Sequence, residues 1–222
     1  MKLKTFLLVG CLGGLFTLSS CTAPTNVKDY SAYVNPFIGT GGHGHTFPGA
    51  VVPHGMIQPS PDTRIDGWDA CSGYYYADST INGFSHTHVS GTGCCDYGDV
   101  LLMPTVGKQQ YRTTDPQSQR LAYASSFSHK NEIAEPGYYS VFLDTYQVKA
   151  EISSTKRGAI HRYTFPENAE SGFIIDLDYS LQRQTNSEME IEVISDTEIC
   201  GHKKTTYWAF DQYINFYAKF SK

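Results

Sequence analysis

The feature that most constrains the fold is a period-two alternation of apolar and polar residues in the C-terminal half of the chain. In the run 147–153, Val148, Ala150 and Ile152 alternate with polar neighbours. Successive side chains of a strand point to opposite faces, so this pattern predicts a strand with one buried face. The pattern recurs in the runs 159–165, 173–177, 188–193 and 214–220. With turn residues and no helical period between the runs, the sequence predicts an all-β antiparallel sandwich.

Shorter strands are expected in the N-terminal half, at 51–58, 81–88 and 100–103, where loops rich in Gly, Pro and Asp separate them. The proline-bearing turns at 135–137 and 165–168 predict hairpin connections. Helix is expected to be nearly absent.

The region 35–104 has a composition unlike that of an apolar core. It holds five of the eight histidines, namely His43, His45, His54, His86 and His88, among many glycines and aspartates. Such a chain is typical of backbone and side chains shaped around a polar ligand.

The N-terminus resembles a bacterial lipoprotein leader. Lys2 and Lys4 precede an apolar run at 6–18 that is shorter than the about 20 residues of a membrane span. The sequence Leu-Ser-Ser-Cys then ends at Cys21, the expected lipidation site. The alternative is a plain signal peptide that ends near a cysteine.

These features predict a leader at 1–20, a polar tether at 21–29 and one large domain at 30–222. The mature protein should be a membrane-anchored lipoprotein in the periplasm or on the cell surface. The net charge of −5 and the lack of a Lys/Arg cluster argue against nucleic acid as a partner. The 14% aromatic content, with sixteen tyrosines, suits both an all-β fold and a surface that stacks on sugar rings.

Four cysteines follow Cys21, namely Cys71, Cys94, Cys95 and Cys200. In an oxidising compartment they allow three pairings, and free buried thiols are an equal alternative. The adjacent Cys94 and Cys95 lack the C-x-x-C spacing of a zinc site.

His86 and His88 are two residues apart, so both rings would project from one face if this segment is a strand. Together with Asp96 or Asp99 they would form a metal site. The alternative is a pair of histidines that bind a ligand or fix the loops around them.

Two further motifs suggest a binding site. His43 and His45 lie in a glycine-rich loop, which is either a ligand-contacting segment or a flexible surface loop. Gly67-Trp68-Asp69 places an indole beside a carboxylate, a pairing that suits a sugar. The alternative is a core tryptophan with Asp69 capping a turn.

No catalytic residue emerges from the site-rich region. Its carboxylates are aspartates in turn-rich contexts, at positions 62, 66, 69, 78, 96 and 99, and it contains no glutamate. An inverting glycosidase needs two carboxyl groups roughly 6.5–9.5 Å apart, with one held protonated. Nor does Gly-Thr-Gly-Cys-Cys at 91–95 have the strand-to-helix setting of a nucleophile elbow.

A series of ordered motifs resembles the N-terminal domain of glycoside hydrolase family 92. These are Val-Asn-Pro-Phe-Ile-Gly-Thr at 34–40, Gly-His-Thr-Phe-Pro-Gly-Ala at 44–50, Gly-Trp-Asp at 67–69, Ser-Gly-Tyr at 72–74, Gly-Phe-Ser-His-Thr-His at 83–88, Ser-Gly-Thr-Gly at 90–93, Asp-Tyr-Gly-Asp at 96–99, Pro-Gly-Tyr-Tyr at 136–139 and His-Arg-Tyr-Thr-Phe at 161–165. The resemblance spans about 30–222.

The resemblance implies a calcium-dependent, exo-acting, inverting α-mannosidase that trims α-mannoside oligosaccharides of N-glycans or mannan. It also implies a galactose-mutarotase-like β-sandwich followed by a larger C-terminal (α/α)6 catalytic domain. The acid, the base and most calcium ligands would belong to that second domain, which has no counterpart in this sequence. Because the last apolar run ends without a covering segment, we expect a truncated product that is inactive alone. The alternative is a mannose-binding surface lipoprotein without catalysis.

Residue by residue, the resemblance makes Trp68 the aromatic that this domain contributes to the sugar pocket. Gly67, Asp69, His86 and His88 would line the pocket or fix its loops. We expect His43, His45 and Asp96 in adjacent pocket loops.

Overall fold

The computed structural model describes residues 28–109, 111 and 118–221. The expected leader at 1–20 and the expected lipidation site Cys21 lie outside the described residues. All strands belong to the compact unit 31–222. In the described part of the chain, no helix combines the length and apolar character needed to cross a membrane.

The largest sheet has five antiparallel strands. In spatial order these are β2 (Thr80–Ile81), β5 (Ser125–Glu135), β6 (Tyr138–Leu143), β7 (Val148–Ser154) and β8 (Ala159–Thr164). In β7 the side chains of Val148, Ala150 and Ile152 are buried, whereas Lys149 and Ser153 are exposed. The face predicted from the alternation is therefore confirmed.

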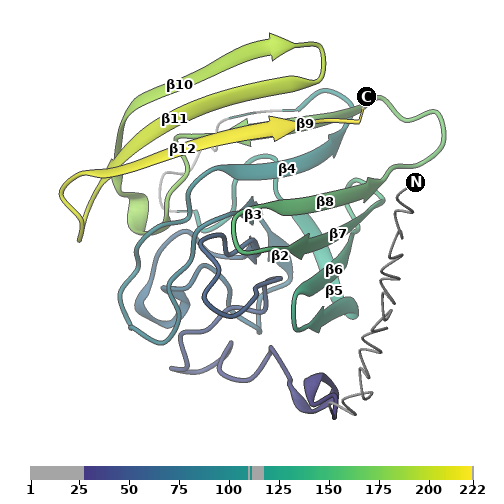
Figure 1. Cartoon of the computed structure of the whole chain (residues 1–222). Coiled ribbons are helices and arrows are strands. Elements are labelled where there is room, and N and C mark those ends of the chain that lie inside the picture. The colour runs from purple at the N-terminus through teal and green to yellow at the C-terminus, as the bar shows by residue number, and fades with distance from the viewer. Residues whose placement is uncertain (1–27, 110, 112–117, 222) are drawn as a thin grey trace, which may run out of the picture. The chain divides into compact units, whose positions relative to one another are not determined.

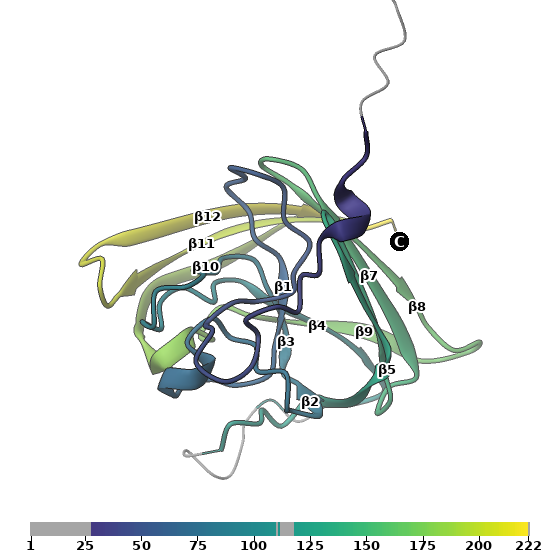
Figure 2. The same ribbon diagram turned by 90° about the horizontal axis from the view of Figure 1, so that it is seen from below.

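A second antiparallel sheet packs against the first. Its strands, in spatial order, are β1 (Ser60–Asp62), β3 (Gly83–Ser85), β4 (Leu101–Val106) and β9 (Ser171–Asp176). The ring of Phe84 in β3 lies 6.4 Å from the rings of Tyr139 in β6 and Tyr163 in β8. The buried apolar cluster takes side chains from both sheets. The predicted β-sandwich is confirmed (Figures 1 and 2).

The third sheet is a long antiparallel meander of β10 (Thr185–Ser195), β11 (Glu198–Thr206) and β12 (Gln212–Lys219), drawn in light green to yellow in Figure 1. The strands expected from the last two alternating runs are confirmed. Burial of the β10 face is not found, since Ile191 is 40% and Val193 72% exposed. The reason is that no other layer covers this part of the strand, since every residue from Glu188 to Ser195 is exposed, on both faces.

Helix is limited to three short 3-10 turns in the described residues, as predicted. They are η1 (Ser31–Tyr33), η2 (Trp68–Ala70) and η3 (Leu181–Arg183).

Three further details of the predicted fold are wrong. No strand forms at 51–58, because the chain turns at Pro53-His54-Gly55, where the Gly55 amide donates to the Val52 carbonyl (3.0 Å). The predicted strand at 81–88 breaks into β2 and β3, and the latter ends at Ser85. The turn at 165–168 joins β8 to β9, which lie in different sheets, so it is no hairpin. The turn at 135–137 is a hairpin between β5 and β6, as predicted.

Candidate functional site

Trp68 lies on the surface at the start of η2. The residue before it, Gly67, has a φ of +107°, a conformation that glycine adopts readily and other residues rarely. This backbone turn presents the indole to solvent, and Trp68 is 58% exposed. An exposed tryptophan held at a glycine turn is better suited to contacting a ligand than to filling a core.

Two histidine rings hold the indole in place. The ring centroids of His43 and His45 lie 4.9 Å and 4.4 Å from that of Trp68. The His43 Nδ1 atom pairs with the Asp69 carboxylate. Gly93 lies against both His45 and the indole, because a Cβ on it would lie 3.2 Å from the His45 ring and 3.3 Å from Trp68 Nε1. We call these five residues the Trp68 cluster.

The Trp68 cluster also contains a buried polar atom, Nε2 of His45. His45 is only 7% exposed, and its Nε2 atom has no hydrogen-bond partner within the described part of the chain. Buried polar atoms normally have a partner, so an unpaired one beside an exposed indole is suited to a ligand. The cluster thus combines a flat apolar face with a carboxylate and an imidazole, as a sugar requires. The binding roles of Gly67, Trp68 and Asp69 remain predictions.

His86 and His88 do not project from one strand face, because β3 ends before either residue. His86 Nε2 lies 3.1 Å from His161 Nε2 on β8, and His86 Nδ1 lies 2.7 Å from the Val100 carbonyl. Burial lowers the pKa of His86 and, together with the nearby His86, that of His161. This pair joins the two sheets of the sandwich.

The neutral histidine pair permits only one arrangement of hydrogens. A carbonyl only accepts, so His86 Nδ1 must donate to Val100 and His86 Nε2 must accept from His161. His161 Nδ1 then accepts from the Tyr163 hydroxyl, at 2.7 Å. Both imidazoles are therefore fully occupied within the fold.

His88 is buried with Asp62, the last residue of β1. The His88 Nε2 atom lies 2.7 Å from Asp62 Oδ1, and Nδ1 lies 2.7 Å from the Gln58 carbonyl. Both side chains of the pair are 0% exposed. Since Nδ1 must donate to the carbonyl, one proton lies between Nε2 and the carboxylate. This geometry favours the loop-fixing role for His88 over direct ligand contact.

The metal site considered for His86, His88 and Asp96 does not form. Asp96 accepts from the Gln184 side-chain amide (3.0 Å) and from the Tyr97 backbone amide. The hydrogen bonds of His86 and His88 go to other groups. No group of three or more His, Cys, Asp or Glu is placed to hold a metal ion among the residues that the structure describes.

A buried ion pair between Lys203 of β11 and Asp99 was not foreseen. The Nζ–Oδ1 distance is 3.1 Å, and both side chains are 0% exposed. Asp99 also accepts from Thr87 and Thr205, and Lys203 donates to the Tyr179 carbonyl (2.8 Å). Burial lowers the pKa of Lys203, and Asp99 offsets part of that effect. Lys203 lies four residues after Ile199, so in a strand both side chains point to the same face. This spacing was the sequence signal for an inward-facing charge.

Glu132 of β5 is a second buried carboxylate that the sequence did not single out. It accepts from the Tyr74 hydroxyl (3.0 Å), the Tyr139 hydroxyl (2.7 Å) and His129 Nδ1 (2.6 Å). The His129 ring stacks on Tyr76 at 4.2 Å. Glu132 lies outside the region 35–104, from which the candidate site residues were taken.

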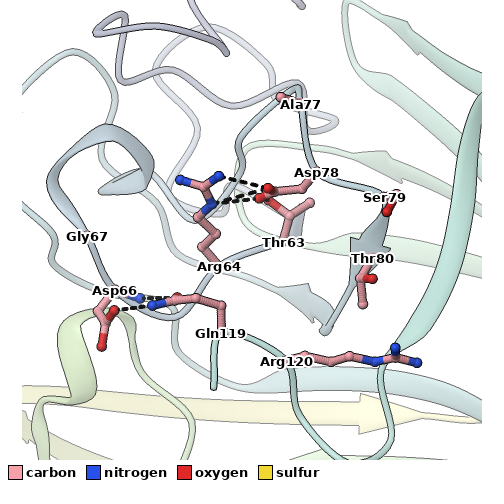
Figure 3. A pocket seen from close by; sticks show the side chains of 10 residues that line it. All are labelled: Thr63, Arg64, Asp66, Gly67, Ala77, Asp78, Ser79, Thr80, Gln119 and Arg120. Carbon is pink, nitrogen blue, oxygen red and sulfur yellow. Dashed lines mark hydrogen bonds and ion pairs between the residues drawn. The ribbon is translucent and has the colours of Figure 1, made fainter. Parts of the chain in front are cut away.

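A shallow polar hollow of about 520 Å³ is bordered by Gly67 (Figure 3). Within it, Arg64 donates to the Asp78 carboxylate at 2.9 Å, and Gln119 hydrogen-bonds Asp66. Burial acts to raise the pKa of Asp66, but hydrogen bonds from Gln119 and an arginine leave it lowered. Most charged side chains that line the hollow thus already have a partner within the fold. The hollow is therefore a weaker candidate for a ligand site than the Trp68 cluster.

The chain is similar to known glycosidases. The family model for the glycosyl hydrolase family 92 N-terminal domain matches residues 33–222. A family GH92 α-mannosidase from Bacteroides thetaiotaomicron, solved in complex with mannoimidazole, matches 86% of this chain with 40% identity and a TM-score of 0.80. An inverting GH92 mannosidase from B. thetaiotaomicron VPI-5482 matches 79% with 30% identity and a TM-score of 0.63. An uncharacterized secreted glycosidase from Arthroderma benhamiae is 32% identical over 143 residues, or 63% of this chain.

These matches involve only part of each relative. The chain spans 25% of the first mannosidase, 23% of the second and 18% of the fungal glycosidase. The family match nevertheless covers most of this sequence, and the sandwich described above is the fold of the matched region. The chain therefore belongs to glycoside hydrolase family 92, whose N-terminal domain it contains at residues 33–222.

Proposed function

We propose that this domain forms part of the sugar pocket of an inverting, exo-acting α-mannosidase that trims mannan or N-glycans. The exposed Trp68, held between His43 and His45, is the observation that carries this proposal. Support comes from the solved relatives, of which one binds mannoimidazole and another is described as an inverting mannosidase. In this role the indole stacks on the mannose ring, and Asp69 and His45 bind hydroxyl groups.

The proposed catalytic partner is a C-terminal (α/α)6 domain that supplies the acid and the base. Exposed aromatic side chains support such an interface, since Trp208 is 67% and Phe210 82% exposed. Contiguous exposed apolar surface commonly marks a contact with another domain or protein. Residues 1–222 alone are then inactive, because this domain offers only one wall of the cleft.

Calcium dependence is part of the proposal for the complete enzyme. No group of three or more His, Cys, Asp or Glu side chains converges among the described residues. Most calcium ligands would lie in the second domain of the complete enzyme. Chelation should abolish turnover by the complete enzyme while leaving the thermal unfolding of the isolated chain unchanged.

The proposed location is the periplasm or the cell surface, with a lipid anchor on Cys21. The leader sequence supports export, and one relative is described as secreted. A fatty-acid analogue should label the wild-type chain and the Cys11→Ser control in cells, but not Cys21→Ser. Labelling of Cys21→Ser would contradict the anchor.

A chimera tests the role of Trp68. Residues 28–222 would replace the matched region of the 40% identical B. thetaiotaomicron α-mannosidase. We expect the chimera to hydrolyse α-mannosides, and Trp68→Ala to lower kcat/KM by at least about tenfold, equivalent to about 1.4 kcal/mol. Tyr217→Ala, which removes an exposed aromatic ring on β12, is the control and should have little effect. Unchanged kcat/KM in Trp68→Ala would refute the role.

The rival function is a non-catalytic mannose-binding lipoprotein, which the solvent-exposed Trp68 cluster would also permit. Calorimetric titration of the isolated chain with α-mannobiose separates the two. Half of a cleft gives little affinity, because the entropy cost of binding is offset by few contacts. Measurable binding without turnover would favour the rival, whereas turnover by the isolated chain would refute the need for a second domain.

A further inference from the structure

Three thiols gather beside the Trp68 cluster. Cys71 follows η2 and is 1% exposed, Cys95 is 4% exposed, and the adjacent Cys94 is half-buried. All of them are free thiols in this structure. Cys200 lies apart on β11, where its thiol donates to Glu192.

The two segments that carry these thiols are already in contact. The Cys95 thiol donates to the Gly67 carbonyl, with a sulfur–oxygen distance of 3.6 Å. Gly93 lies against the Trp68 indole so closely that a Cβ would approach Nε1 to 3.3 Å. Burial and a contact with the Cys71 thiol raise the pKa of Cys95 to about 12. Cys71 and Cys95 are thus both buried, and the Cys95 thiol reaches the turn that ends at Cys71.

We propose that Cys71 and Cys95 form a disulfide bond in an oxidising compartment and thereby lock the turn at 67–71 to the loop at 91–95. The neighbouring Cys94 and Cys95 are poor partners for each other, because consecutive residues hold their side chains apart. Burial, and next the nearby Cys94, raise the pKa of Cys71, so Cys94 also lies near Cys71. Cys94 is only half-buried, however, whereas Cys95 is buried as Cys71 is. Cys200 makes its contact elsewhere, so Cys94 and Cys200 stay reduced. Secreted proteins commonly retain such bonds.

The reaction balances with a small-molecule disulfide such as oxidised glutathione. The S–H bonds of Cys71 and Cys95 break, and one S–S bond forms between the two sulfurs. The S–S bond of the oxidant breaks, and its two sulfurs accept the electrons and the two protons. The protein becomes lighter by two hydrogen atoms.

The bond would fix the Trp68 indole against His45 and Gly93 before any ligand binds. This consequence rests on the proposed function, but the bond itself does not. Because the bond closes a loop in the unfolded chain, it should also stabilise the fold.

Peptide mapping tests the assignment on the wild-type chain. The chain is first equilibrated with oxidised glutathione, and its remaining free thiols are then blocked with N-ethylmaleimide. The protein is next cut after aromatic residues, because Tyr74 and Phe84 lie between the two cysteines and cleavage there separates them. We expect a Cys71–Cys95 cross-link, with Cys94 and Cys200 alkylated. Alkylation of both Cys71 and Cys95, or a cross-link that includes Cys94 or Cys200, would overturn the proposal. No sugar enters the experiment, so its result is independent of the proposed function.

Unfolding provides a second readout. The oxidised wild-type chain and the Cys200→Ser control should resist urea to a higher concentration than their reduced forms. Cys71→Ser should show no such difference. An equal midpoint for oxidised and reduced wild type would contradict a bond that locks the fold.

Discussion

The Nε2 atoms of His86 and His161 lie 3.1 Å apart, one on the residue that follows β3 and the other on β8 of the facing sheet. Each ring uses its second nitrogen as well, on the Val100 carbonyl and the Tyr163 hydroxyl. A proton added to His86 Nε2 would place two N–H groups face to face. The contact therefore holds only while His86 is neutral.

This contact predicts a loss of stability in mild acid. The folded-state pKa values of His86 and His161 lie below the usual 6.5, so the unfolded chain takes up protons first as the pH falls. Stability from the pair is thus present above about pH 6.5 and is lost progressively below it, at about 1.4 kcal/mol for each unit of pKa difference. Urea unfolding midpoints between pH 7.5 and pH 5 measure this loss of stability. His161→Gln should flatten the pH dependence, whereas the exposed control His54→Asn should not.

Removal of Lys203 should destabilise the fold strongly. Lys203→Met leaves Asp99 as a buried, unpaired charge, which typically costs about 3–5 kcal/mol. The double variant Lys203→Met/Asp99→Asn should recover part of this loss. The control Lys219→Met breaks the exposed pair with Glu198 and should cost no more than about 1 kcal/mol. Equal losses in the two lysine variants, measured by chemical denaturation, would contradict the buried-charge argument.

Gly73 is expected to be irreplaceable for steric reasons. Its φ is +86°, and a Cβ would lie 2.1 Å from Asp62 Oδ1, in the buried pair with His88. Gly107 has a similar φ of +74° but no atom within 4 Å of a Cβ. Gly107→Ala should therefore cost only the backbone strain of about 1–2 kcal/mol. Gly73→Ala should cost clearly more in the free energy of unfolding, and a similar cost in both variants would contradict the predicted clash.

The carboxylate of Glu132 should be essential for packing. Glu132→Ala leaves the buried hydroxyls of Tyr74 and Tyr139 without their acceptor, at about 1–3 kcal/mol for each group. Adding Tyr139→Phe should recover part of the loss, because it removes one of these donors. Glu135→Ala, at the exposed end of the same strand, should change the unfolding free energy by about 0.5 kcal/mol or less. Calorimetric unfolding would measure all three variants.

Local patterns in the sequence were sufficient for the class of fold. The alternation of Val148, Ala150 and Ile152 is a property of neighbouring residues, and it predicted β7 and its buried face. The pattern failed where a short turn overrides it, as at Pro53-His54-Gly55. It also gave no indication that β8 and β9 belong to different sheets, because the sheet that a strand joins depends on distant partners.

The sequence by itself determined an antiparallel β-sandwich, a family resemblance and a polar region around Trp68. The tertiary structure decided which side chains in that region are available. It left Trp68 exposed and His45 Nε2 without a hydrogen-bond partner among the described residues. It paired His86 with His161 and buried His88 against Asp62. The physical reason is that local spacing sets the direction of a side chain only within a regular strand. Beyond Ser85, hydrogen-bond partners far along the chain set the direction instead.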